Sequence, residues 1–327
     1  FGLPMWQFAL SASDANRFLL RWIRAATGRR TLLVFNGCYH GTVDDVFVDL
    51  DGKGAPRQRA SLLGQVHDLT RHTRVVEFND LPALEAALAE GDVACVLAEP
   101  VMTNIGMVLP APGFLEKLRA LTEKTGTLLI LDETHTLSSG PGGYTRVAGL
   151  RPDGLVFGKP IAGGIPAAAY GFSADVAMRI RDYLGKRGEG RSGIGTTLSG
   201  SRIQLALIKA VLKEFFTEEA FAPLIDRARR LEKGIADVII KHGVPWHVTR
   251  VGARVEFMCC PERPKNGFEA SKVIHRPIDE AVHHFLLNRG VVITPFHNMM
   301  LICPATTDAH VETLISGLDR CLADLKS

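Results

Sequence analysis

The sequence predicts an α/β fold, in which helices cover both faces of a mainly parallel sheet and a smaller α+β domain follows. Two observations carry this prediction. Short apolar segments with strand character alternate with amphipathic helices over the first two thirds of the chain. The 327 residues, 46% of them hydrophobic and 22% charged, are also enough to build a large core.

The alternation starts behind a helix that follows the motif "SASDAN" (11–16). The predicted helices are bounded by ordinary stop signals, such as Gly91 and Gly126. Because sheets of this class bind ligands beyond the carboxyl ends of their strands, functional residues are expected directly after the strands. We predict strands at 31–37, 74–78, 93–100, 127–133, 154–158 and 167–173, and helices at 81–91 and 112–126.

The character of the sequence changes after a long helix at 201–216. We therefore predict a large domain over 1–216 and a smaller α+β domain over 217–327. The polar stretch 261–270 is expected to be a surface loop. In the smaller domain we predict helices at 220–243, 277–290 and 308–325, and strands within 247–260, at 291–296 and at 299–303.

Composition and charge exclude several classes of protein. The net charge of +3 is small and spread along the chain, which argues against nucleic-acid binding. No apolar run approaches the roughly 20 residues of a membrane span. Six cysteines without a CxxC pair favour reduced thiols in a cytoplasmic protein. The chain opens at Phe1 in an apolar stretch typical of a domain interior, so we expect the natural N-terminus to lie further upstream.

A single lysine, Lys159, stands between an apolar strand and a glycine-rich turn. Burial of an ammonium group is costly and lowers its pKa, which leaves a neutral, nucleophilic amine that can form a Schiff base with a carbonyl. Asp132 lies at the end of another strand, so the two side chains could meet in one cleft. Pyridoxal 5′-phosphate needs such a lysine, and an acid that keeps its pyridinium nitrogen protonated. Asp132 could otherwise cap a turn.

Two further features fit this cofactor. Ser11, Ala12 and Ser13 precede a helix, where backbone N–H groups and hydroxyls favour a phosphate. Tyr39 follows a strand directly and could lie flat against a ring. The alternatives are an ordinary helix cap for the three residues, a core aromatic for Tyr39 and a structural histidine for His40.

The ordered set of motifs resembles the class III aminotransferases, which are pyridoxal-phosphate-dependent enzymes of fold type I. The resemblance covers essentially the whole chain and is strongest to the branch that contains glutamate-1-semialdehyde aminomutase and the β-amino-acid transaminases. It implies a homodimer with the active site at the interface. The motifs that carry it are "SASDAN", "GCYHG", "LAEPV", "LLILDE" and "GKPIAGGIPAAAYG".

The resemblance also implies roles for single residues. Lys159 would hold the cofactor and move the proton, and Asp132 would pair with the ring nitrogen. Thr196 would reach the phosphate of the neighbouring subunit's cofactor. The remaining implied positions are Ser11, Ala12 and Ser13 at the phosphate, Tyr39 and Thr134 on the two faces of the ring, and Glu99 and His135 near the site; no metal site is expected.

Some positions depart from the family pattern. Ala12 and Asp14 replace a glycine and a glutamate, and Thr134 replaces a valine. The stretch 294–300 lacks the arginine that β-amino-acid transaminases use for a substrate carboxylate, so His297 or Asn298 is expected to face the substrate instead.

Three functions stay open at this point. The leading hypothesis is an aminotransferase that takes an amino donor and a keto acid acceptor. An intramolecular aminomutase of the glutamate-1-semialdehyde type would use the same residues. A fold homologue without activity, acting as a binding or assembly subunit, is the third.

Overall fold

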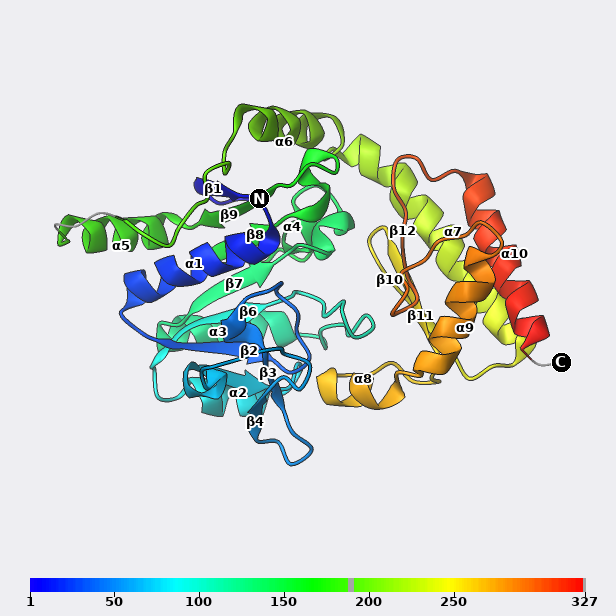
Figure 1. Ribbon diagram of the computed structural model, residues 1–327, viewed down its shortest axis with the longest axis horizontal. Helices are drawn as coiled ribbons and strands as arrows, with labels where there is room; N and C mark the ends of the chain where they lie inside the picture. The colour runs from blue at the N-terminus through cyan, green and yellow to red at the C-terminus, as the bar shows by residue number, and fades with distance from the viewer. Residues whose placement is uncertain (188–190, 326–327) are drawn as a thin grey trace.

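The computed structural model describes residues 1–187 and 191–325. Its centre is a seven-stranded sheet in the order β1-β9-β8-β7-β6-β2-β5 (Figure 1). Neighbouring strands are parallel from β8 to β5, whereas β9 and β1 are antiparallel to their neighbours. The predicted α/β class with a mainly parallel sheet is confirmed. The strands are β1 (Met5–Ala9), β2 (Thr31–Phe35), β5 (Thr73–Val76), β6 (Val93–Ala98), β7 (Leu128–Asp132), β8 (Gly154–Phe157) and β9 (Ala168–Phe172).

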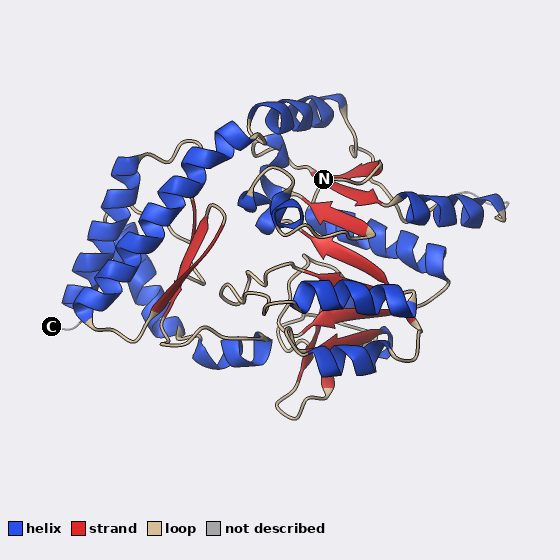
Figure 2. Ribbon diagram, turned by 180° about the vertical axis from the view of Figure 1, so that it is seen from behind, coloured by secondary structure: helices blue, strands red, loops and turns tan. Residues whose placement is uncertain are grey.

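Helices cover both faces of this sheet (Figure 2). α1 and α5 lie on one face, and α2 and α3 lie on the other. Because both faces are covered, the central strands are mostly apolar, and every residue of β6, β7 and β8 is buried. The helices of this part are α1 (Ala12–Thr27), α2 (Leu81–Leu88), α3 (Phe114–Thr125), α4 (Gly143–Val147), α5 (Ala174–Gly185) and α6 (Arg202–Glu214), with 3₁₀ turns η1 (Asp44–Val46), η2 (Leu69–His72), η3 (Thr136–Ser139) and η4 (Lys159–Ala162) and a hairpin of β3 (Val48–Leu50) and β4 (Pro56–Gln58).

A second, antiparallel sheet in the order β10-β11-β12 packs against three helices beyond the large sheet. Its hydrophobic core runs from Leu224 to Leu322 and shares no residue with the core of the large sheet. The domain boundary at residue 217 remains a prediction. The last two residues of the predicted small domain, 326 and 327, lie outside the described part of the chain. The elements are α7 (Glu218–His242), β10 (His247–Val251), β11 (Arg254–Met258), α8 (Gly267–Val273), α9 (Arg276–Leu287), β12 (Met299–Leu301) and α10 (Asp308–Asp324).

Two local predictions are wrong. The segment 291–296 is not a strand; Pro295 cannot donate a ladder hydrogen bond, and the strand that pairs with β11 in this part of the chain is β12. The stretch 261–270 is not a loop throughout, because α8 begins at Gly267. That glycine lies so close to the end of β2 that a Cβ atom would come within 2.0 Å of the Asn36 carbonyl oxygen. The packing of α8 on the large sheet is a long-range contact that the local sequence does not reveal.

Glu133, next to the last residue of β7, holds the segment that follows the sheet. Its carboxylate is fully buried and accepts hydrogen bonds from the hydroxyls of Thr136 and Thr145 and from the backbone N–H groups of Tyr144 (3.1 Å) and Thr145 (2.5 Å). Burial raises the pKa of Glu133, and these donors oppose the increase.

We expect Glu133→Ala to lower the free energy of unfolding by about 3 kcal/mol, because several buried donors lose their acceptor. Urea unfolding measures the change. The exposed Glu116 on α3 provides the matched control, since Glu116→Ala should leave the midpoint within experimental scatter. Equal midpoints for the two variants would show that Glu133 does not stabilise this segment.

Candidate active site

A cavity of about 370 Å³ opens beyond the carboxyl ends of the parallel strands. Glu99 follows β6, Asp132 ends β7 and Lys159 follows β8, so three neighbouring strands each deliver one ionisable side chain. Nine of the ten residues predicted to form the site line this cavity: Ser11, Ala12, Ser13, Tyr39, Glu99, Asp132, Thr134, His135 and Lys159.

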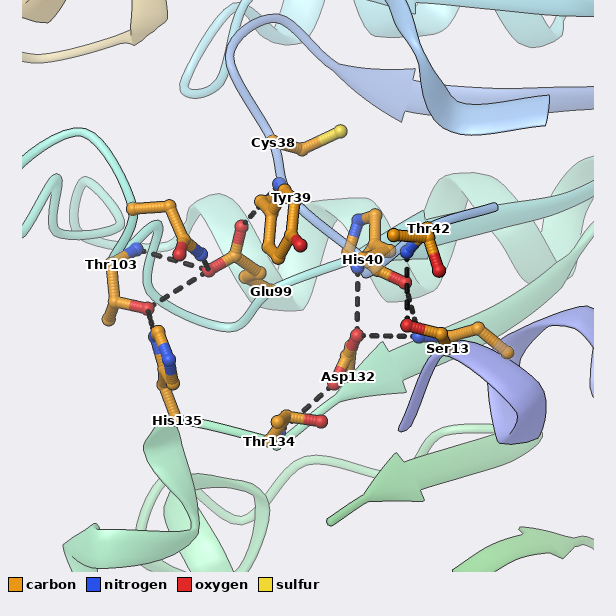
Figure 3. A network of polar contacts seen from close by, with 12 residues as sticks. Ser13, Cys38, Tyr39, His40, Thr42, Glu99, Thr103, Asp132, Thr134 and His135 are labelled. Atoms are coloured by element: carbon orange, nitrogen blue, oxygen red, sulfur yellow. Dashed lines mark hydrogen bonds and ion pairs between the residues drawn. The ribbon is translucent and has the colours of Figure 1, made fainter. Parts of the chain in front are cut away.

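Asp132 is buried and accepts three hydrogen bonds (Figure 3). Its Oδ2 accepts from Asn16 Nδ2 at 2.8 Å and lies 3.0 Å from His40 Nδ1, and its Oδ1 accepts from the backbone N–H of Thr134 at 3.0 Å. Burial alone would raise the pKa of Asp132, but His40 lowers it most strongly and the other donors add to this, so that the pKa is about 2. The carboxylate is therefore ionised at neutral pH.

Asn16 was not predicted at this site, and His40 was expected only as a structural histidine. Burial would lower the pKa of His40, but Cys38 and Asp132 raise it to about 10, so a protonated imidazole pairs with the carboxylate. Asn16 connects the two elements by donating to the His40 carbonyl oxygen at 3.1 Å as well as to Asp132. The sequence pattern of α1 could have indicated Asn16. It is a polar residue on the apolar face of this helix, and all other buried residues of the helix are hydrophobic.

Lys159 opens the 3₁₀ turn η4 directly after β8. Its φ of 49° is in the left-handed region, which a residue other than glycine seldom adopts. The residue is exposed and lines the cavity. Desolvation by the surrounding protein lowers the pKa of Lys159, and Arg254 lowers it further, while Asp132 and Glu99 oppose the decrease. The amine is thus closer to its neutral, nucleophilic form than a surface lysine.

Tyr39 and Glu99 form another wall of the cavity. Glu99 is buried, and its Oε1 accepts from the backbone N–H of Tyr39 at 3.1 Å. This bond fixes the backbone of Tyr39, a residue that is 42% exposed and therefore does not belong to the hydrophobic core. A ring in this position is available to a flat ligand.

The N-terminus of α1 borders the cavity and contains Ser11, Ala12 and Ser13. Ser11 is the N-cap, and its Oγ accepts from the backbone N–H of Asp14 at 3.1 Å. Ser13 Oγ accepts from the backbone N–H of Thr42 at 3.0 Å. The N–H groups of Ala12 and Ser13 belong to the first turn, where no carbonyl of the helix can accept from them. The cap interpretation is confirmed for Ser11, and the free N–H groups still suit an anion.

Gly41 packs directly on this helix end. Its φ is 81°, and a Cβ atom would lie 2.1 Å from Ser13 Oγ. We expect Gly41→Ala to push Ser13 and the first turn of α1 away and to weaken cofactor binding about tenfold or more, because the steric conflict and the left-handed backbone both oppose an alanine. Equilibrium dialysis with pyridoxal phosphate measures this.

The matched control is Gly52→Ala, since no atom lies within 4 Å of the added Cβ and the backbone is not in the left-handed region. If the two glycine variants bind the cofactor equally well, the end of α1 does not hold the phosphate.

Of the ten residues predicted to form the site, Thr196 is the one that does not line the cavity. It is exposed, and its hydrogen bonds join its N and Oγ1 to Ser199 Oγ at 3.2 and 2.8 Å. His297 and Asn298 are not among the residues that line this cavity, and the expectation that one of them faces the substrate stays a prediction. They are bound within the small domain, His297 to Glu256 (3.0 Å) and Asn298 to Asp279 (2.7 Å).

Comparison with known proteins decides the family. The family model for aminotransferase class III matches residues 5–322. The chain belongs to the class III aminotransferases. A curated relative, glutamate-1-semialdehyde 2,1-aminomutase 1 of Bacillus cereus (strain G9842), is 32% identical over 325 residues, which are 97% of this chain and 73% of that protein.

Solved structures agree with this assignment. A glutamate-1-semialdehyde-aminomutase from Pseudomonas aeruginosa PAO1 superposes with a TM-score of 0.96 at 48% identity, over 99% of this chain and 73% of that one. An omega-transaminase from Sphaerobacter thermophilus gives a TM-score of 0.89 at 28% identity, over 99% of this chain and 75% of that one. This class III enzyme therefore has aminomutases and transaminases among its similar structures.

Pyridoxal phosphate is the cofactor of this member of the class III aminotransferase family, and a Pseudomonas aeruginosa relative was solved in complex with PMP. The residues present fit the group. An ionised carboxylate suits a pyridinium nitrogen, a lysine of lowered pKa suits a carbonyl, and the free N–H groups of α1 suit a phosphate. Thr134 Oγ1 is also buried without a hydrogen-bond partner among the described residues. Within residues 1–187 and 191–325, none of the helices combines the length and apolar character that crossing a membrane requires.

Proposed function

We propose that this enzyme is an aminotransferase that moves an amino group from an amino acid or amine to a keto acid. The observation that carries the proposal is the pair of Lys159 and Asp132, which neighbouring strands place in the wall of one cavity. Bound pyridoxal phosphate would supply a carbonyl that condenses with amines. Its ring would delocalise the electron pair that remains on the substrate carbon after a proton is removed.

The residues of this chain would supply the remaining chemistry. Lys159 Nζ, with its lowered pKa, can bind the cofactor carbonyl, and once released it can take up and deliver a proton. Asp132 would hold a positive N–H of the ring, and His40 and Asn16 keep that carboxylate charged and in place. Binding and orientation would come from Ser11, Ala12 and Ser13 at the phosphate, Tyr39 and Thr134 at the ring faces, and Glu99 and His135 at the side wall.

The second candidate is an intramolecular aminomutase, which the names of the relatives from Bacillus cereus and Pseudomonas aeruginosa favour. One assay separates the two. The protein with pyridoxal phosphate is incubated either with an amino donor and a keto acid, or with glutamate-1-semialdehyde alone.

The aminotransferase proposal expects an aminated keto acid in the first mixture. Isomerised product in the second mixture, without transfer in the first, would assign the aminomutase reaction instead. Bound cofactor whose absorbance no donor changes would identify a binding or assembly subunit.

We also propose that the protein is a homodimer with the active site at its interface. Support comes from exposed apolar side chains on α5, on α6 and in the segments that precede β9 and α6. Sedimentation equilibrium tests the proposal, and a monomer at micromolar concentration would contradict it. The side chains are Ile165, Met178, Tyr183, Leu198, Ile203 and Leu205.

A further inference from the structure

A chain of hydrogen bonds runs from Glu99 through Thr103 to His135 along one wall of the cavity (Figure 3). Thr103 Oγ1 lies 3.0 Å from Glu99 Oε2 and 2.6 Å from His135 Nδ1. Glu99 and His135 line the cavity, whereas Thr103 is fully buried behind them. A hydroxyl carries a single proton, so it can donate to only one of these two neighbours.

The surroundings of Glu99 decide the direction of the chain. Its Oε1 accepts from the backbone N–H of Tyr39, and its Oε2 accepts from the backbone N–H of Thr103 and from Asn104 Nδ2, each at 3.1 Å. All three are N–H groups, which can only donate. Burial raises the pKa of Glu99, but donors on both oxygens favour the carboxylate, which can only accept. The Thr103 hydroxyl therefore donates its proton to Glu99.

The tautomer of His135 follows from this direction. The Thr103 hydroxyl donates its one hydrogen bond to Glu99, so its oxygen must accept a hydrogen bond from His135. The imidazole therefore carries its proton on Nδ1. Burial lowers the pKa of His135 to about 2, and Arg254 and Lys159 contribute to this. The ring is thus neutral, and its Nε2 holds a free lone pair.

His135 lines the cavity, and its Nδ1 is directed toward the buried Thr103. The Nε2 edge is therefore the polar edge of the ring that is available to a bound molecule. No described residue forms a hydrogen bond with Nε2. Lys159 and His135 line the same cavity, so a molecule bound at Lys159 shares this space with the His135 ring.

We propose that Glu99 and Thr103 are positioning residues that fix His135 as the Nδ1–H tautomer, so that His135 Nε2 accepts a hydrogen bond from an N–H or O–H group of the molecule bound beside Lys159. The identity of that molecule, as cofactor or amino substrate, rests on the proposed function. The tautomer does not, since the three side chains determine it without a ligand. This wall of the cavity then selects hydrogen-bond donors and disfavours a carboxylate, which has no proton to offer.

The direct test is ¹⁵N NMR of the full chain with labelled histidine rings, recorded with and without pyridoxal phosphate; His135→Gln assigns the signal. The expected result is a protonated Nδ1 and a bare Nε2 in His135. Thr103→Val keeps the shape but removes the hydroxyl, and we expect the proton to move at least partly to Nε2. Thr103→Ser should restore the wild-type signal. Thr122→Val is the matched control, because it removes a buried threonine hydroxyl from α3, and it should leave the His135 signal unchanged.

Kinetics give the second readout. We expect kcat/KM for amino transfer to fall about tenfold in Thr103→Val and to stay within about twofold of the wild type in Thr103→Ser, as for the loss of one hydrogen bond. A wild-type His135 that carries its proton on Nε2, or a tautomer that Thr103→Val does not alter, would overturn the proposal. The wild-type spectrum decides even if a variant does not fold. A wild type with the expected tautomer but no amino transfer would refute the proposed function and leave the tautomer assignment intact.

Discussion

Lys159→Ala should abolish amino transfer, with kcat reduced by about a thousandfold or more, because the variant loses both the nucleophile and the group that moves the proton. Single-turnover measurements on the variant loaded with pyridoxal phosphate give the rate. The cofactor should also dissociate by dialysis far more readily than from the wild type, since no covalent bond to the protein can form at position 159.

A matched control separates this effect from the loss of any lysine. Lys209 lies on α6 with an exposed side chain, and Lys209→Ala should retain wild-type turnover. The fold of Lys159→Ala should persist, because removal of a partly desolvated cation does not create an unpaired charge. Turnover within tenfold of the wild type would show that Lys159 is not the catalytic amine.

Asp132→Asn has the second largest expected effect. The variant keeps the shape but loses the charge that pairs with His40 and the acceptor that Asn16 uses. We expect kcat to fall by about a hundredfold, because a neutral amide does not hold a ring nitrogen in its protonated form. We also expect the free energy of unfolding to fall by about 3 kcal/mol, since His40 remains as an unpaired buried charge.

The pH dependence of the stability loss gives an independent check. The pKa of Asp132 is about 2 in the folded protein and close to 3.9 in an unfolded chain, so its contribution is complete above the unfolded value and vanishes as the pH falls through the folded one. The difference in stability between the wild type and Asp132→Asn should therefore shrink below about pH 4. Urea unfolding measures this difference in the free energy of unfolding. A difference that stays constant from pH 7 to pH 3 would contradict the stabilising role of the His40–Asp132 pair.

The sequence predicted much of the site because the chemistry lies next to strong local signals. The runs "LLIL" and "GLVF" are apolar and lie in buried strands of a parallel sheet. Parallel strands end at one edge, so Asp132 and Lys159 had to lie near each other once both runs were assigned as strands.

The remaining parts depend on contacts between distant segments. Asn16 meets Asp132 across 116 positions and His40 meets it across 92, and no local periodicity indicates either pair. Thr103 was missed for a similar reason, since its partner His135 is 32 positions away. β1 was not predicted as a strand, because it forms the edge of the sheet and its mixed pattern of burial gives only a weak signal.

The assignment of Lys159 as the residue that binds the cofactor is the central claim, and one measurement tests it most directly. The protein is loaded with pyridoxal phosphate, reduced with borohydride to make an imine bond permanent, digested and mapped by mass spectrometry. The account predicts a pyridoxyl group on the peptide that contains Lys159. A pyridoxyl group on a different lysine, or none on any peptide from fully loaded protein, would contradict it.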